Sequence, residues 1–228
     1  MNILVVDVGG TNVKFIATGH SEKRRFESGP ELTPQQMVEG VKQGAEDWKY
    51  DVVSVGFPGP VLHCKPLAEP HNLGEGWVGF DFQKAFDRPV KLMNDAAMQA
   101  LGSYEGGKML FLGLGTGLGS AMIVDGAIEP MEIGHLPYRK RTFEDYVGER
   151  GLKRVGKKKW RHYVEDVVER LTAALEPDYI VLGGGNVKKL KQLPPKCREG
   201  DNANAFKGGF RMWHDTSDAQ PATAAESR

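Results

Sequence analysis

The segment Asp7-Val8-Gly9-Gly10-Thr11-Asn12-Val13-Lys14 joins the end of one short apolar run, residues 2–8, to the start of a second, residues 13–17. Apolar runs flanking a Gly-Gly pair predict a strand, a tight turn and a second strand. Glycines at such a turn let backbone N–H groups approach a phosphate, and successive amides form a concave anion site. Asp7 adds a carboxylate that can hold Mg²⁺ through water, Thr11 adds a hydroxyl and Lys14 adds a cation.

Glycine turns of this kind recur twice in the second half of the chain. An apolar run at residues 108–114 meets Gly115-Thr116-Gly117, and a further strand is predicted at residues 120–124. A strand at residues 179–182 then runs into Gly183-Gly184-Gly185-Asn186. A single glycine turn is most often only a hairpin, but three with these companions favour a nucleotide or polyphosphate ligand.

Helical patterns alternate with these strands. The spacing predicts helices over residues 34–48 and 96–104, a strand over 52–57 that ends at Pro58-Gly59-Pro60, and a strand over 90–93 that ends at Asn94-Asp95. We therefore expect an α/β protein of two similar lobes, with glycine turns free to face a shared cleft. The predicted boundaries are 1–103 for a small N-terminal lobe, 104–214 for a large C-terminal lobe, and 215–228 for a disordered polar tail.

Composition excludes several classes of partner. Lys plus Arg and Asp plus Glu each number 30 among 228 residues, so no global field recruits nucleic acid or a membrane surface. The N-terminus has no secretory pattern, and no apolar run is long enough to span a bilayer. Cys64 and Cys197 lie far apart without a CxxC spacing, which indicates a reducing compartment and no structural zinc. A cytoplasmic protein is expected.

The ordered set of motifs resembles the ROK family of sugar kinases, within the sugar kinase, hexokinase and actin-like superfamily. DVGGTNVK, LGTGLGSA and LGGGN resemble its phosphate-1, phosphate-2 and adenosine motifs. FPGP (57–60), HNLGEGW (71–77), MND (93–95) and EIGH (132–135) follow the family's order, so the resemblance covers residues 2 to about 212. The polyphosphate-dependent glucokinases of the family are the most similar. The resemblance implies a two-lobed actin-like (ribonuclease H-like) fold with an interdomain cleft.

The resemblance also implies a set of roles. Asp95 is the general base, and Asp7 holds Mg²⁺ through water with the phosphoryl donor. The residues that contact the sugar are Gly59, Asn72, Asn94, Asp95, Glu132, His135 and Glu144. The residues that bind phosphate or nucleotide are Asp7, Gly9, Gly10, Thr11, Asn12, Lys14, Gly115, Thr116, Gly117, Gly183, Gly184, Gly185 and Asn186.

Each of the singled-out side chains also has an ordinary structural interpretation. Asp95 could cap the helix that begins near residue 96. His135 could be a buried core histidine, and Glu144 could be a solvated surface carboxylate among basic residues. Trp77 could border the sugar or be a packing anchor.

The segment between His135 and Gly151 departs from the family pattern. LPYRKRTFEDYVGER stands where the family has a cysteine cluster, and it contains no thiol. We therefore expect no structural zinc and a site held by packing. Residues 139–161 also hold ten Lys or Arg against three acids, a net charge of +7 that could attract polyphosphate or ATP if it borders the cleft.

These observations predict a glucokinase that transfers a phosphoryl group from polyphosphate, ATP or both to the 6-hydroxyl of glucose. One alternative is a ROK kinase that uses ATP alone on another hexose, such as fructose or N-acetylmannosamine. Another is a non-catalytic sugar-sensing regulator, although ROK repressors carry a helix-turn-helix before the kinase fold and here the first strand is predicted from Asn2. A homodimer is common in the family and is a possible assembly.

Overall fold

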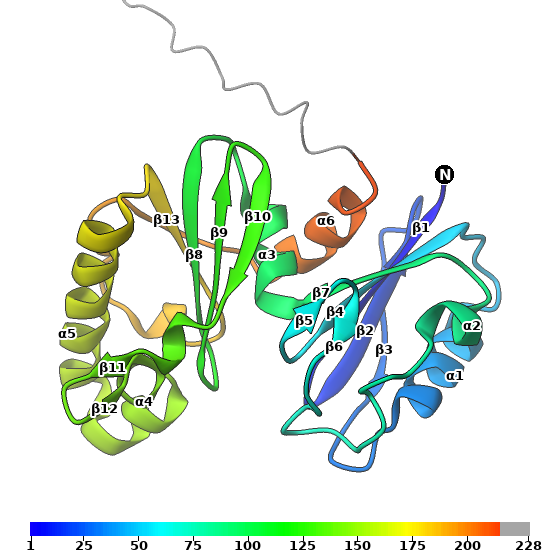
Figure 1. The fold of residues 1–228 in the computed structure, drawn as a ribbon, viewed down its shortest axis with the longest axis horizontal. Coiled ribbons are helices and arrows are strands. Elements are labelled where there is room, and N and C mark those ends of the chain that lie inside the picture. The colour runs from blue at the N-terminus through cyan, green and yellow to red at the C-terminus, as the bar shows by residue number, and fades with distance from the viewer. Residues whose placement is uncertain (215–228) are drawn as a thin grey trace, which may run out of the picture. The chain divides into compact units, whose positions relative to one another are not determined.

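The computed structural model describes residues 1–214, so the predicted tail at 215–228 lies outside the described residues. The described chain forms two compact units (Figure 1). The first comprises Met1–Gly102 with Ala205–His214, and the second comprises Ser103–Asn204. Among the described helices, none is both long and apolar enough to cross a membrane.

A five-stranded mixed sheet forms the centre of the first unit, in the order β3-β2-β1-β4-β7. Its strands are β1 (Ile3–Val8), β2 (Asn12–Ala17), β3 (Arg24–Glu27), β4 (Val52–Phe57) and β7 (Val90–Asn94). β1, β4 and β7 run parallel, whereas β1, β2 and β3 form an antiparallel meander. The predicted hairpin around Gly9-Gly10 is therefore confirmed.

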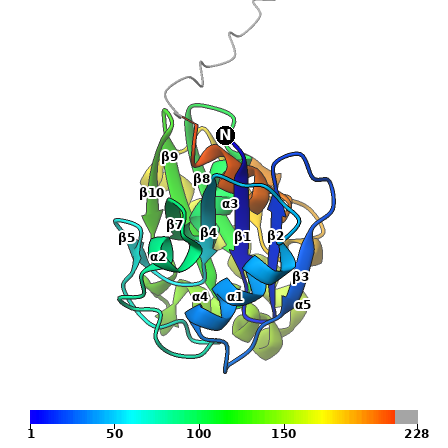
Figure 2. The ribbon, with the colours of Figure 1, turned by 90° about the vertical axis from the view of Figure 1, so that its right-hand side faces the viewer.

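Helices cover both faces of this sheet (Figure 2). α1 (Pro34–Gly44) and α2 (Phe82–Phe86) bury their apolar side chains with Leu4, Val6 and Val8 of β1. Because side chains alternate along a strand, Val5 faces the opposite way, where Gly209 of α6 (Asn204–Arg211) lies against it. α3 (Asp95–Ser103) follows β7, and the short strands β5 (Val61–Leu62) and β6 (Lys65–Pro66) form a separate hairpin.

A second five-stranded sheet, ordered β10-β9-β8-β13-β14, repeats this pattern in the second unit. Its strands are β8 (Lys108–Leu114), β9 (Leu118–Val124), β10 (Ala127–Met131), β13 (Tyr179–Gly183) and β14 (Cys197–Glu199). β8, β13 and β14 are parallel, and β8, β9 and β10 form an antiparallel meander. The predicted similarity of the two halves thus extends to strand order and direction.

Helices α4 (Phe143–Val147) and α5 (Glu149–Leu175) pack on one face of the second sheet. α5 is interrupted at Gly156, whose φ is +73°, and Trp160 beyond the break donates a 2.8 Å hydrogen bond from Nε1 to the carbonyl of Val147. The remaining elements are η1 (Ile133–His135), β11 (Pro137–Tyr138), β12 (Arg141–Thr142) and η2 (Val187–Lys189).

The last helix belongs to a different unit than the predicted lobe boundary implies. The prediction gave residues 205–214 to the second lobe, whereas α6 packs on the sheet of the first unit. The Ser54 hydroxyl donates to the carbonyl of Gly209 at 2.6 Å, and Trp213 Nε1 donates to Ser54 Oγ at 2.9 Å. Arg211 donates to the carbonyl of Leu101 at the end of α3. These contacts join distant segments, so the local sequence pattern does not reveal them.

Candidate active site

The residues predicted for the first unit gather at one edge of its sheet. Asp7 on β1 lies opposite Gly56 on β4, and Phe57 on β4 lies opposite Asn94 on β7. Because the three strands are parallel, the glycine turn after β1, the Pro-Gly-Pro segment after β4 and the Asn94-Asp95 pair after β7 all follow carboxyl ends. That edge is where open α/β sheets bind their ligands.

The first glycine turn is anchored by its neighbours. Gly9 donates a backbone hydrogen bond to the carbonyl of Asn12 at 3.0 Å, and the Ser28 hydroxyl donates to the Gly9 carbonyl at 2.6 Å. A Cβ added at Gly10 would lie 3.0 Å from Cβ of Asn72, so the predicted sugar-contacting Asn72 lies beside this turn. Within residues 1–214, the amides of Gly10 and Thr11 donate no hydrogen bond to the chain, which leaves them available to an anion.

Asp7 lies at the end of β1, opposite Lys14. Burial raises the pKa of its carboxyl group above the ordinary value, while the nearby cations Lys14 and Lys23 act in the opposite direction. A single carboxylate fits Mg²⁺, which usually binds one or two carboxylates together with waters and substrate phosphates. Among the described residues, no group of three or more His, Cys, Asp or Glu could hold a metal by itself.

Asn94 and Asp95 form different hydrogen bonds at the start of α3. Oδ1 of Asn94 accepts from the amides of Ala96 (2.9 Å) and Ala97 (3.1 Å), and its Nδ2 donates to the carbonyl of Gly59 (3.0 Å). Asn94 therefore supplies the helix cap and ties β7 to the Pro-Gly-Pro segment. Asp95, partly exposed, accepts a 2.7 Å hydrogen bond at Oδ1 from the amide of Ala96. The capping role that the sequence left open for Asp95 thus belongs mainly to Asn94.

The other two glycine turns lie against each other in the second unit. β8 and β13 are parallel, with Gly113 opposite Gly183. Asn186, buried, donates from its backbone amide to the Leu114 carbonyl (3.0 Å) and from Nδ2 to the Gly115 carbonyl (3.1 Å). Gly184 has a φ of +85°, and a Cβ there would lie 2.5 Å from the Leu114 carbonyl oxygen. The predicted phosphate-2 and adenosine motifs are therefore in direct contact.

The predicted sugar residues of the second unit lie close to these motifs. Glu144, half-buried on α4, has Oε2 2.5 Å from the position that a Cβ on Gly117 would take. It is therefore not the solvated surface carboxylate of the alternative interpretation. The side chain of His135 is 67% exposed and lies 3.7 Å from Oε2 of Glu132, so it is not a core histidine. In the first unit, Trp77 is fully buried against Phe57, which confirms its interpretation as a packing anchor.

Comparison with known proteins identifies the family. The sequence profile of the ROK family matches residues 3–152, well over half of the chain. The chain belongs to the ROK family. A polyphosphate glucokinase of Mycobacterium tuberculosis is 26% identical over 216 residues, covering 83% of this chain and 80% of that protein.

Two solved structures share the fold. An inorganic polyphosphate/ATP-glucomannokinase from an Arthrobacter species has a TM-score of 0.79 at 22% identity, covering 92% of this chain and 97% of its own. A ROK glucokinase from Streptomyces griseus in complex with glucose and AMPPNP has a TM-score of 0.75 at 14% identity, covering 93% and 99%. The fold is therefore the actin-like fold of ROK sugar kinases.

An aromatic cluster occupies the segment where the sequence departs from the cysteine cluster of the family pattern. The ring of Tyr138 packs 5.2 Å from Phe143 and 5.0 Å from Tyr146, and Tyr146 packs 4.9 Å from Tyr163 of α5. The Tyr138 hydroxyl donates to Asp166 of α5. These contacts fix the segment that carries Glu132, His135 and Glu144 to the long helix. The expectation that packing holds this part of the site is consistent with them, and the expected lack of zinc stays a prediction.

The basic segment at residues 139–161 divides into two groups of cations. Several are engaged locally: Arg139 pairs with Asp166, Arg154 donates to the carbonyl of Asp145, and Arg161 donates to the carbonyl of Lys189. Lys157, Lys158 and Lys159, which follow the break in α5, are exposed and form no ion pair with another described residue. Only part of the strip is therefore available to a ligand.

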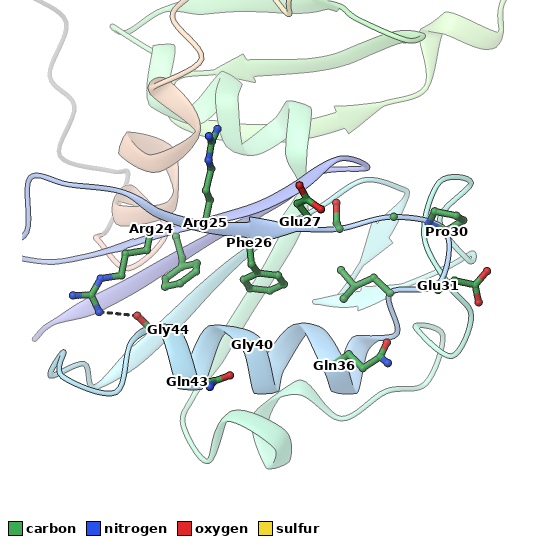
Figure 3. Close-up of a pocket in the computed structure, with 14 residues that line it drawn as sticks. Arg24, Arg25, Phe26, Glu27, Pro30, Glu31, Gln36, Gly40, Gln43 and Gly44 are labelled. Atoms are coloured by element: carbon green, nitrogen blue, oxygen red, sulfur yellow. Dashed lines mark hydrogen bonds between the residues drawn. The ribbon is translucent and has the colours of Figure 1, made fainter.

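A large groove in the first unit lies elsewhere. This groove, of about 1030 Å³, runs between β3 and α1, with Phe15 and Phe26 among its lining residues (Figure 3). Its walls include none of the residues predicted to bind sugar or phosphate. The ring of Phe26 covers Gly40 of α1, and Arg24 donates to the carbonyl of Gly44 at 2.7 Å. The candidate site residues of each unit therefore lie at its glycine turns and not in this groove.

The sequence did not predict β3 as a strand, because its residues Arg24–Glu27 are mostly charged. It therefore missed Arg25, which lies opposite Lys14 in the sheet. Alternation of Arg25 and Glu27 with the inward-facing Phe26 was the available signal.

Proposed function

We propose that the chain is a hexose kinase that transfers a phosphoryl group from polyphosphate, ATP or both to the 6-hydroxyl of glucose. Membership of the ROK family supports the reaction class. The observation that carries the proposal is the position of Asp95, which follows β7 at the same sheet edge where Asp7 ends β1 and the first glycine turn follows it. The proposed proton acceptor and the proposed phosphate-binding turn thus follow two parallel strands of one sheet, with β4 between them.

In the proposed reaction, the sugar hydroxyl oxygen forms a bond to the terminal phosphorus of the donor as the bond to the leaving phosphate breaks. Asp95 orients that hydroxyl and accepts its proton. The amides of Gly10 and Thr11, together with Lys14, stabilise the charge on the transferred phosphoryl group. Mg²⁺, when bound with the donor near Asp7, supplies further neutralisation of phosphate charge.

The remaining residues position the two substrates. Asn72 and Glu144 are proposed to hold sugar hydroxyls, since each side chain lies beside a glycine turn. Glu132 and His135 are exposed and only 3.7 Å apart, which suits a pair that shares one hydroxyl. Asn94 and Gly59 already bond to each other, so we propose that they shape the sugar site.

The choice of donor rests on similarity and on charge. The Mycobacterium tuberculosis relative is described as a polyphosphate glucokinase and the Arthrobacter structure as a polyphosphate/ATP-glucomannokinase. The exposed Lys157, Lys158 and Lys159 give this chain a surface that attracts a long polyanion.

A coupled assay of the purified protein tests this proposal, with glucose, mannose, fructose and N-acetylmannosamine as acceptors and ATP and long-chain polyphosphate as donors. Glucose 6-phosphate formation with polyphosphate at least as fast as with ATP is the expected result. Turnover of another sugar with ATP alone would replace the substrate assignment. Tight sugar binding without turnover by either donor would identify a sensor and overturn the kinase.

A further inference from the structure

A row of charged residues crosses three strands at the edge of the first sheet. Asp7 on β1 is the Cα partner of Lys14 on β2, and Lys14 is the partner of Arg25 on β3. Side chains of residues directly opposite each other in an antiparallel pair lie on the same face. Asp7, Lys14 and Arg25 therefore share one face, and both cations are exposed.

Figure 3 shows Arg25 directed away from the groove, on the opposite side of β3 from Phe26 and α1. Arg24 lies on the groove side, where it forms an ion pair with Asp47 and packs its guanidinium 4.2 Å from the Trp48 ring centre. The two adjacent arginines thus have different surroundings. The Arg24 side chain is bound to other residues of the chain, whereas the side chain of Arg25 forms no ion pair or hydrogen bond within residues 1–214.

Lys23 adds a third cation on the same face. Its Nζ lies 4.6 Å from the ring centre of Phe206 in α6, the helix that packs on this side of the sheet. Its charge also acts on the Asp7 carboxyl group, as does that of Lys14. The carboxylates on this face at the row are Asp7, which is half-buried, and Glu27, which shares the face of Arg25 by alternation along β3.

A pair of like charges directly opposite each other destabilises a sheet. Lys14 and Arg25 form such a pair. In the described chain, the Arg25 side chain also has no acidic partner that would offset the repulsion. An anion bound between them would remove the repulsion. The first glycine turn, with its available amides, connects the two strands that carry Asp7 and Lys14, so the row begins at a phosphate-binding element.

We propose that Arg25, opposite Lys14 and with Lys23 beside it, forms a subsite for the phosphates of an inorganic polyphosphate donor beyond those held by the glycine turns and Lys14. The subsite rests on the proposed kinase function and specifies its donor. A guanidinium can bind one phosphate through two hydrogen bonds, and a chain of phosphates can contact several cations at once. ATP has only three phosphates and continues into a nucleoside, so it gains little from Arg25.

The test compares Arg25→Gln with the matched control Arg24→Gln. Loss of a charge-assisted contact predicts a KM for long-chain polyphosphate about 5- to 20-fold higher in Arg25→Gln, with a change of less than about twofold for ATP. Arg24→Gln should change neither KM. Arg25→Lys, which keeps the charge, should recover part of the affinity. Melting temperatures of all three variants check that the fold is intact.

Calorimetric binding of long-chain polyphosphate to the protein without sugar gives a second readout that does not depend on turnover. Weaker binding in Arg25→Gln than in Arg24→Gln is expected. Equal polyphosphate affinity in the wild type and in both variants would overturn the subsite while leaving the kinase proposal intact. A wild-type protein that binds polyphosphate through Arg25 but phosphorylates no sugar would keep the subsite and overturn the proposed function.

Discussion

The absence of a Cβ at Gly117 leaves room for the carboxylate of Glu144. A Cβ at Gly117 would lie 2.5 Å from Oε2 of Glu144, the far end of a flexible side chain. Gly115, in the same turn, has no atom within 4 Å of its added Cβ. The turn therefore contains a position that restrains Glu144 and a matched position that does not.

Gly117→Ala should displace the Glu144 carboxylate and raise the KM for sugar by about tenfold, the loss expected for one hydrogen bond to a charged group. Gly115→Ala should leave that KM within about twofold, because it removes no such contact. Steady-state kinetics at saturating donor measure both. Equal effects of the two substitutions on the sugar KM would contradict a sugar-binding role for Glu144.

At the scale of elements, α4 and the short strands before it are held in place by contacts with α5. The Tyr138 hydroxyl, followed by Arg170 and Arg139, holds the pKa of Asp166 below its ordinary value despite partial burial, which acts in the opposite direction. The unfolded chain therefore binds a proton at Asp166 at higher pH than the folded chain does. This contribution to stability is present above the unfolded value of about 3.9 and is lost as the pH falls through the lower folded value.

Asp166→Asn should therefore lower the urea midpoint clearly at about pH 7, and the difference from wild type should shrink at about pH 3. Glu165→Gln is the control, because Glu165 is exposed and lies 3.3 Å from His162, three residues earlier on α5. Urea titrations at both pH values measure the difference. An Asp166→Asn deficit that stays constant between them would show that the ion pairs of Asp166 do not fix this segment.

Helix α6 illustrates a contact that sequence patterns do not reveal. A Cβ at Gly208 would lie 1.8 Å from the carbonyl oxygen of Met98, which is backbone and cannot rotate away. Gly208→Ala should therefore cost about 1–3 kcal/mol of stability. Lys207→Ala, at an exposed position of the same helix, should cost much less. Equal urea midpoints for the two variants would show that α6 does not pack closely on α3.

For the whole molecule, the sequence predicted the repeated strand-turn-strand organisation and the placement of glycine turns at strand ends. It did so because glycine turns and apolar runs are local signals. The capping role of Asn94, the burial of Asn186 against Gly115 and the alignment of Lys14 with Arg25 depend on strand register and on contacts between distant segments. Such contacts produce no periodic pattern in the amino-acid sequence.

We propose that this chain phosphorylates a sugar with Asp95 as the base, and the substitution Asp95→Asn tests this most directly. The amide can still accept the hydrogen bond from Ala96, so the fold and sugar affinity should be retained. Because the amide cannot accept a proton, kcat should fall by about 10²–10⁴-fold while the sugar Kd stays within about twofold. A variant that turns over within about threefold of the wild type would contradict the account.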